Sequence, residues 1–279
     1  MPIYARPTRL DQALQVLAGG DMIILAGGTD YYPAHVGTSL AGDILDISAI
    51  HSLRGITEHR GHWRIGATTT WTGVIESGLP PLFDGLKRAA REVGGVQIQN
   101  RGTIAGNLCN ASPAADGVPP LLALDAQVEL ASAGRIRRIA LQDFLLDNRR
   151  TALARGELAT AVIVPKPARA ALSHFLKLGT RKYLVISIVM VAATVEHENG
   201  KVCAARIAVG ACSPLARRLP ELEAVLVGET LDAALGAKAD ASQFRALAPI
   251  DDVRASRTYR AEAALTMVRR TLSQLGAMG

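Results

Sequence analysis

The stretch that decides the fold reads NRGTIAGNLCNASPAAD and covers residues 100–116. It consists mostly of small and polar residues. A shorter loop of the same character, AGGTD at 26–30, follows an apolar run of buried-strand length at 22–26. Small residues let a backbone come close to a ligand, and the exposed N–H groups of such a turn form a nest suited to phosphate oxygens. Together the two loops predict a clamp that holds a pyrophosphate from both sides.

Each loop has a plainer interpretation when it is taken alone. A Gly-Gly pair after a strand, such as Gly27-Gly28, is commonly a turn that needs a positive φ. Asp116 either accepts a ribose hydroxyl or caps a helix that starts near residue 117, and its chemistry alone favours the cap. The sequence has no Rossmann GxGxxG at a strand–helix junction, no P-loop and no GxSxG nucleophile elbow.

Length and composition narrow the class of protein. The 279 residues exceed the usual single-domain range of about 100–200, so two compact units are expected. No apolar run approaches the roughly 18 residues of a transmembrane helix, and the N-terminus lacks an apolar signal core. We therefore expect a cytoplasmic protein without membrane insertion. Three cysteines without metal-ligand spacing, few aromatic residues and dispersed basic residues predict no metal site and no nucleic-acid binding.

The hydrophobic pattern predicts a chain of mixed helices and strands. Strands are expected at 43–47, 63–67, 158–164, 184–195 and 202–211, with hairpins around Ala133-Gly134 and Asn199-Gly200. Helices are expected at 68–77, 81–93, 118–125, 220–227 and 261–275. The Pro165-Lys166-Pro167 exit marks the predicted boundary between domains 1–167 and 168–279, the first of which divides into subdomains at about 1–55 and 56–167.

Four motifs, in this order and spacing, resemble one known family. They are AGGTD at 26–30, NRGTIAGNLCNASPAAD at 100–116, FLKLGTRK at 175–182 and DDVRASRTYR at 251–260. Over nearly its whole length the chain resembles the FAD-binding medium subunit of molybdenum hydroxylases, the group that includes carbon monoxide, xanthine and nicotinate dehydrogenases. The resemblance implies an α+β chain with the two-subdomain FAD-binding fold of vanillyl-alcohol oxidase and p-cresol methylhydroxylase. A C-terminal α+β domain then covers the flavin end.

The resemblance also implies which residues bind the cofactor, and it implies no catalytic residue in this chain. Val93 is similar to a residue that touches the flavin region, Asp116 to an acidic residue that contacts the cofactor, and Lys177 to a basic residue near the flavin ring. For Asp116 this reverses the preference for a cap, and Lys177 is otherwise a solvated lysine at a strand end. The pyrophosphate is assigned to Ile24, Leu25, Ala26, Gly27, Gly28, Thr29, Asp30, Tyr31, Thr103, Ile104, Ala105, Gly106 and Asn107.

One stretch departs from the family pattern. Family members often carry an aspartate or tyrosine after the basic pair Arg181-Lys182, whereas this chain reads Tyr183-Leu184-Val185-Ile186. We expect an apolar wall there against the isoalloxazine. Neither glycine loop offers a His or Cys in an obvious flavin-linking position, and His35 is expected to be a surface or packed histidine. The predicted FAD is therefore bound non-covalently.

The resemblance implies an electron-transfer flavoprotein subunit. Electrons would pass from [2Fe–2S] clusters on a small iron–sulfur subunit through FAD to a final acceptor, while a large subunit carries the molybdenum cofactor. Such heterotrimers often pair into dimers. The helix at 261–275 either docks the iron–sulfur subunit or packs on its own sheet. The alternatives are a stand-alone FAD-dependent oxidase of the same fold and a scaffold subunit without cofactor.

Overall fold

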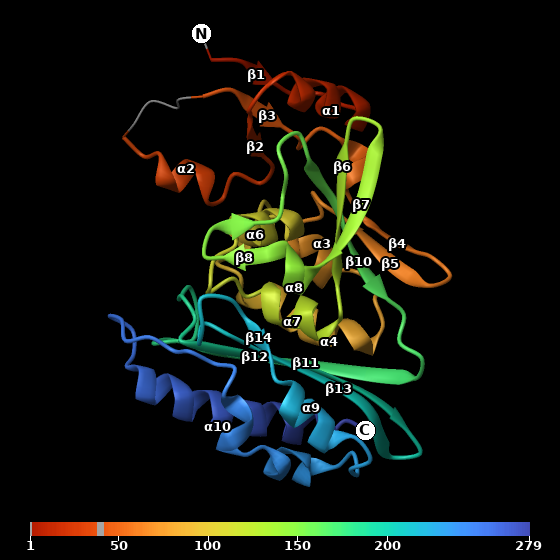
Figure 1. Ribbon diagram of the computed structural model, residues 1–279, viewed down its shortest axis with the longest axis vertical. Coiled ribbons are helices and arrows are strands. Elements are labelled where there is room, and N and C mark those ends of the chain that lie inside the picture. The colour runs from red at the N-terminus through yellow and green to blue at the C-terminus, as the bar shows by residue number, and fades with distance from the viewer. Residues whose placement is uncertain (1, 38–41) are drawn as a thin grey trace.

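Three main sheets are stacked along the long axis of the molecule (Figure 1). The computed structural model describes residues 2–37 and 42–279. The chain runs from an N-terminal lobe, through a middle sheet, to a lower sheet that carries the C-terminal helix. Along the described residues, no helix combines the length and apolar composition needed to cross a membrane.

The N-terminal lobe is a small parallel sheet backed by one helix. Its strand order is β1 (Tyr4–Ala5), β3 (Ile44–Asp46) and β2 (Ile23–Leu25). Helix α1 (Leu10–Gly19) packs Ala13 and Leu17 into a cluster with Leu45. Strand β2 ends at Leu25, so the AGGTD loop leaves the carboxyl end of this sheet as predicted.

The middle sheet is antiparallel and five-stranded. In order across the sheet its strands are β4 (Ile56–Glu58), β5 (His62–Gly66), β10 (Leu158–Pro165), β6 (Gln127–Ser132) and β7 (Arg135–Ala140). The β6–β7 hairpin turns at Ala133-Gly134, which confirms its prediction. The helices that share the core of this sheet are α3 (Trp71–Ile75), α4 (Asp84–Glu92), α6 (Ile104–Asn110), α7 (Val118–Ala123) and α8 (Leu141–Phe144).

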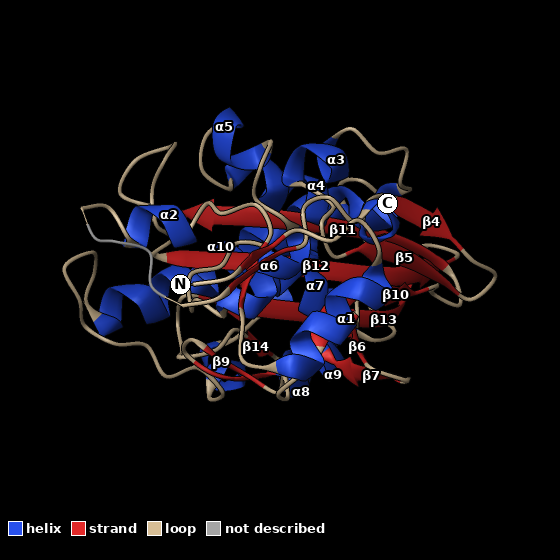
Figure 2. Ribbon diagram, turned by 90° about the horizontal axis from the view of Figure 1, so that it is seen from above, coloured by secondary structure: helices blue, strands red, loops and turns tan. Residues whose placement is uncertain are grey.

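The lower sheet lies between two layers of helices. Its antiparallel strands, in order, are β11 (Ala170–Leu178), β12 (Val189–Glu198), β13 (Lys201–Gly210) and β14 (Arg217–Arg218), and Figure 2 shows the first three running across the molecule. Helices α4 and α7 contact one face, while α9 (Pro220–Leu226) and α10 (Arg257–Gly276) contact the other (Figure 1). The predicted hairpin at Asn199-Gly200 is confirmed, and both residues have positive φ.

Short elements complete the chain. They are α2 (Tyr31–Ala34), η1 (His51–Leu53), η2 (Pro81–Phe83), α5 (Val96–Gln99), β8 (Leu145–Asp147), β9 (Arg150–Thr151), η3 (Ala233–Lys238) and η4 (Ala241–Phe244). Helices α5 and α6 correct the sequence interpretation, because the sequence predicts no helix between 93 and 118 and its glycine and asparagine content there is typical of a loop.

The structure corrects the start of one predicted strand and distinguishes between the two interpretations of the C-terminal helix. The strand predicted at 184–195 begins only at Val189, because Leu184 has a φ of 52° and breaks the extended conformation. The apolar face of α10 is buried in the core of its own sheet through Val268, Leu272 and Leu275. That burial favours the packing interpretation of this helix over a docking role for the same face.

Arg260 in the C-terminal motif fastens α10 to the lower sheet. Its side chain is fully buried and donates to the carbonyl oxygens of Ile188 (2.6 Å) and Ala211 (3.0 Å). Its Nη2 donates to Asp252 at 2.6 Å, while its buried Nε has no partner among the described residues. The hydrogen bonds to Ile188 and Ala211 tie the DDVRASRTYR stretch to the start of β12 and the end of β13.

The β4–β5 hairpin offers a paired test of close packing. A Cβ added at Gly66 would lie 2.3 Å from the carbonyl oxygen of Leu53, whereas one added at Gly61 meets nothing within 4 Å. We expect Gly66→Ala to lower the free energy of unfolding by about 1–3 kcal/mol, since backbone must move to admit the methyl group. Gly61→Ala should stay within about 0.5 kcal/mol of the wild type in urea unfolding. Equal effects of the two substitutions would contradict this packing.

Candidate functional site

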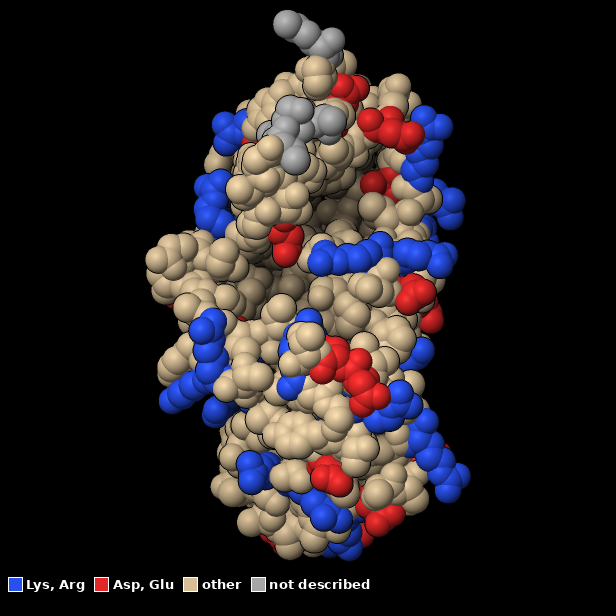
Figure 3. All heavy atoms as spheres, turned by 90° about the vertical axis from the view of Figure 1, so that its left-hand side faces the viewer, with Lys and Arg blue, Asp and Glu red and all other residues tan. Residues whose placement is uncertain are grey.

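A cavity of about 950 Å³ lies where the N-terminal lobe meets the helices of the middle sheet and the edge of the lower sheet. Its walls come mainly from residues 24–35, 93–98, 102–116, 149–159 and 177–186. Figure 3 shows this face of the molecule deeply hollowed. The volume is at the upper end for small-molecule and cofactor sites. Segments far apart in the sequence therefore converge on one ligand-sized space.

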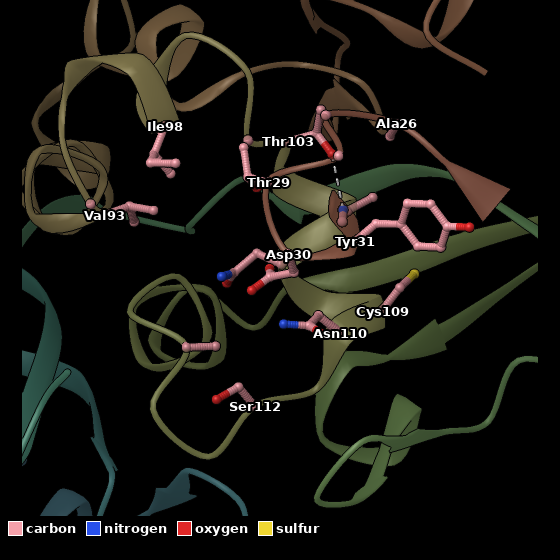
Figure 4. A pocket seen from close by; sticks show the side chains of 18 of the residues that line it. Ala26, Thr29, Asp30, Tyr31, Val93, Ile98, Thr103, Cys109, Asn110 and Ser112 are labelled. Carbon is pink, nitrogen blue, oxygen red and sulfur yellow. Dashed lines mark hydrogen bonds between the residues drawn. The ribbon is translucent and has the colours of Figure 1, made fainter. Parts of the chain in front are cut away.

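The predicted binding residues converge on this cavity with one exception. All of them line it apart from Ile104, which is fully buried in the hydrophobic core of the middle sheet. The backbone N–H of Ile104 also has a partner, the carbonyl oxygen of Thr69. Figure 4 shows Val93 and Ile98 at one end of the cavity and Tyr31 at the other.

The first glycine loop presents a row of free backbone donors. Among the residues that the structure describes, none accepts a hydrogen bond from the N–H groups of residues 27–31. Gly28 has a φ of 73°, which favours glycine. A Cβ at Gly27 would lie 2.0 Å from the carbonyl oxygen of Arg101, so the two loops touch through their backbones. This loop has the open donors that the nest prediction requires.

The second loop differs from that prediction, because the N–H groups of residues 104–107 already have protein partners. It begins helix α6, with Thr103 as the N-cap whose hydroxyl accepts from Gly106 N–H at 3.2 Å (Figure 4). The N–H groups of Ala105 and Asn107 donate to the carbonyl oxygens of Ala67 and Thr103. These N–H groups are therefore not available to form a second backbone nest.

Two buried side-chain oxygens along the cavity still lack a partner. They are Oδ1 of Asn107, from the second loop, and the hydroxyl of Tyr31, which follows the first, and no described residue hydrogen-bonds to either. Buried polar atoms are nearly always hydrogen-bonded in folded proteins. These two atoms therefore indicate a polar ligand, to which the second loop contributes through the side chain of Asn107.

Asp116 is held in a buried cluster at the edge of the cavity. Lys177 Nζ lies 2.7 Å from one carboxylate oxygen, and the hydroxyl of Ser187 donates to the other at 2.6 Å. The side chains of Lys177 and Asp116 are 6% and 10% exposed. Helix α7 has Gly117 at its N-cap with no side-chain cap, which rules out the capping role for Asp116.

The electrostatics of this cluster depend on the pairing. Burial raises the pKa of the Asp116 carboxyl, and the Lys177 ammonium and the Ser187 hydroxyl oppose that rise. Lys177 also donates to the carbonyl oxygen of Glu92 at 3.2 Å, which leaves one of its three donors for a ligand. The pair brings no net charge to this end of the cavity.

Several cavity residues were missed by sequence reasoning. His35 lines the cavity, and its ring contacts that of Tyr31 in a tilted arrangement with 4.4 Å between ring centroids. Arg149 reaches the cavity from the β8–β9 turn, and in the sequence it belongs only to the dispersed basic residues. Cys109 lines it as well, and burial raises the pKa of its thiol to about 12.

The stretch 183–186, where the sequence departs from the family pattern, lies beside the same cavity. Leu184, Val185 and Ile186 line it together with Ile98. Tyr183 does not, and its ring is largely exposed. Residues 184–186 are therefore the part of the expected apolar wall that lines the cavity. In the sequence, their apolar pattern is the same as that of a buried strand.

Comparison with known protein families covers both halves of the chain. Residues 1–167 match the family described as the FAD binding domain in molybdopterin dehydrogenase. Residues 174–275 match the CO dehydrogenase flavoprotein C-terminal domain. The first match alone spans more than half of the 279 residues.

Individual relatives agree over nearly their full lengths. A putative xanthine dehydrogenase FAD-binding subunit of Escherichia coli is 30% identical, with 97% of this chain and 94% of the relative covered. The alpha subunit of the 6-hydroxypseudooxynicotine dehydrogenase complex of Paenarthrobacter nicotinovorans is 33% identical, with 97% and 93% covered. The crystal structure of cyanide-inactivated Cu,Mo-CO dehydrogenase contains a chain with 29% identity, full coverage of both chains and a TM-score of 0.89.

Replacing Lys177 with Met tests the buried pair. The variant leaves Asp116 without its counter-ion, and breaking such a pair costs about 3–5 kcal/mol of unfolding free energy. Loss of the ammonium lets the pKa of Asp116 rise further. A carboxyl whose pKa is higher in the folded than in the unfolded chain stabilises the fold at low pH and loses that contribution as pH rises through the folded pKa. We therefore expect a smaller deficit near pH 5 than near pH 8 in urea unfolding.

The double variant Asp116→Asn, Lys177→Met is the control. It carries neither charge and keeps a partner for Ser187, so its deficit should be smaller than that of Lys177→Met and should not grow between pH 5 and pH 8. A Lys177→Met deficit of equal size at both pH values would contradict the electrostatic role of the pair.

Proposed function

The chain belongs to the FAD-binding subunits of the molybdenum hydroxylase family, and from that premise we propose that it is the electron-transfer flavoprotein subunit of such an enzyme. The observation that carries the proposal is the cavity, which is lined both by the free N–H groups of residues 27–31 and by the Asp116–Lys177 ion pair. A row of free donors suits a diphosphate. A lysine that keeps one free donor suits a ring that gains negative charge on reduction.

The residues present fit FAD by their chemistry. The first loop would bind the diphosphate with its backbone, and Asn107 and Tyr31 would each gain a partner for a buried oxygen. Asp116, Lys177 and the apolar residues 184–186 would orient the isoalloxazine. When bound, FAD supplies one- and two-electron chemistry, and the protein supplies position and electrostatics. Burial keeps the Cys109 thiol protonated, with its pKa at about 12, which supports non-covalent binding.

The finer fold assignment stays a proposal. We assign the vanillyl-alcohol oxidase type of fold with domains 1–167 and 168–279 and subdomains at about 1–55 and 56–167. Separate hydrophobic cores under the N-terminal lobe and the middle sheet support the two subdomains, since the cavity lies where they meet. The core between the lower sheet and α10 supports the C-terminal domain.

The electron route and the assembly are also proposed. The chain has three cysteines, fewer than the four ligands of one [2Fe–2S] cluster, which supports clusters on an iron–sulfur small subunit. The molybdenum cofactor would reside on a large subunit, and the heterotrimers would pair into dimers. All three cysteines are free thiols, as suits the proposed cytoplasmic location.

Two measurements test this function. The purified chain, reconstituted with FAD, should show flavin absorbance that acid releases into solution. A colourless protein that FAD cannot reconstitute would refute the proposal. The chain tagged in its native cells should copurify with two further subunits that contain iron and molybdenum. A monomer that oxidises an alcohol unaided would favour the stand-alone oxidase.

Gly27→Ala should weaken FAD binding by separating the two loops. The added Cβ would lie 2.0 Å from the Arg101 carbonyl oxygen. A packing cost of about 1–3 kcal/mol corresponds to about a 5- to 150-fold rise in the dissociation constant if it falls on the bound state. Gly20→Ala is the control, since its Cβ meets nothing within 4 Å. Flavin fluorescence quenching measures both, and equal affinities would refute the role of the loop contact.

A further inference from the structure

Arg149 occupies an unusual backbone conformation at the cavity wall. It lies in the turn between β8 and β9 with a φ of 58°, in the left-handed region that favours Gly and Asn. Its N–H donates to the carbonyl oxygen of Ala111 at 2.9 Å. Its guanidinium contacts Asn110, donating through Nη1 to the side-chain oxygen and, at 3.4 Å, to the carbonyl oxygen. Both Arg149 and Asn110 line the cavity, and Figure 4 shows Asn110 pointing into it.

No carboxylate among the described residues forms an ion pair with Arg149. The formal charges on the lining are those of Asp30, Asp116, Arg149 and Lys177. Asp116 and Lys177 neutralise each other. Among the described residues no acid forms an ion pair with Arg149, and its Nε and Nη2 donors have no partner. Asp30 balances the formal charge of Arg149 along the lining, but the two form no ion pair. The guanidinium therefore brings an unpaired positive charge and three free N–H donors to a site that we assign to a dinucleotide.

We infer that Arg149 binds the diphosphate of that dinucleotide, acting together with the free N–H groups of the first loop. This inference rests on the flavin function proposed above. A guanidinium offers a planar fork of donors that matches two phosphate oxygens. It also takes the place of the second backbone nest that the sequence predicted, since the N–H groups of residues 104–107 already donate to protein oxygens.

A purely structural role for Arg149 is the rival explanation. Helix α6 ends at Asn110, and Arg149 donates to the carbonyl oxygens of Asn110 and Ala111, as a helix C-cap does. The backbone N–H that binds Ala111 would be supplied by any residue except proline. A cap alone therefore gives no reason for an arginine at a φ that glycine adopts at lower cost.

The test uses three variants at this position and a neighbour as control. Arg149→Ala and Arg149→Gly remove the guanidinium, Arg149→Lys keeps a charge without the fork, and Arg150→Ala removes an exposed arginine that does not line the cavity. Each apoprotein is titrated with FAD and with riboflavin, which lacks the diphosphate, and flavin fluorescence is recorded. ADP is the competitor, and melting temperature is measured without ligand.

We expect Arg149→Ala and Arg149→Gly to weaken FAD binding by about 10- to 100-fold. Riboflavin binding should change by less than about twofold, and ADP should compete less well with FAD. Arg149→Lys should fall between, and Arg150→Ala should match the wild type. Arg149→Gly should melt no lower than Arg149→Ala, because glycine relieves the positive φ.

Two results would overturn the inference while leaving the flavin function intact. One is wild-type FAD affinity in Arg149→Ala. The other is an equal loss of FAD and riboflavin binding together with a lower melting temperature, which is the signature of a helix cap. Failure of the wild-type chain to bind FAD would instead refute the proposed function itself.

Discussion

The contact between the backbones of Gly27 and Arg101 sets the geometry on which the cavity depends. A Cβ at Gly27 would lie 2.0 Å from the Arg101 carbonyl oxygen, so the loops approach this closely only because residue 27 has no side chain. The N-terminal lobe is thereby held against the middle sheet. With one side of the first loop fixed, the N–H groups of residues 27–31 stay without protein partners. The first loop therefore combines a close backbone contact to Arg101 with N–H groups that remain available to a ligand.

The lower sheet is tied to the same site by polar contacts. Arg260 donates to the carbonyl oxygen of Ile188, and the adjacent Ser187 donates to Asp116. Asp116 in turn pairs with Lys177 on β11. All of these groups are buried or nearly so, where hydrogen bonds and charge pairs are strong and unmatched partners are costly. The C-terminal motif of the sequence, remote from the cavity, therefore helps to determine the orientation of its charged end.

Local patterns in the sequence predicted which hairpins and strands form better than they predicted where each element begins and ends. The hairpins at Ala133-Gly134 and Asn199-Gly200 follow from turn chemistry that acts within a few residues. The start of β12 was predicted too early, because the apolar residues 184–186 serve the cavity wall and an apolar strand alike. Helix α6 was missed because its glycine and asparagine content is typical of loops, while its stability comes from core contacts of Ile104 and Leu108.

The sequence by itself predicted a ligand clamp of two glycine loops from their small residues, and the order of its motifs indicated the family, whose resemblance in turn placed Asp116 and Lys177 at the cofactor. Only the tertiary structure decided that the first loop keeps its N–H groups free while those of residues 104–107 in the second donate to protein oxygens. It alone paired Asp116 with Lys177 and brought Arg149 to the cavity. Burial, pairing and the direction of a donor depend on residues distant in sequence, and no local pattern encodes them.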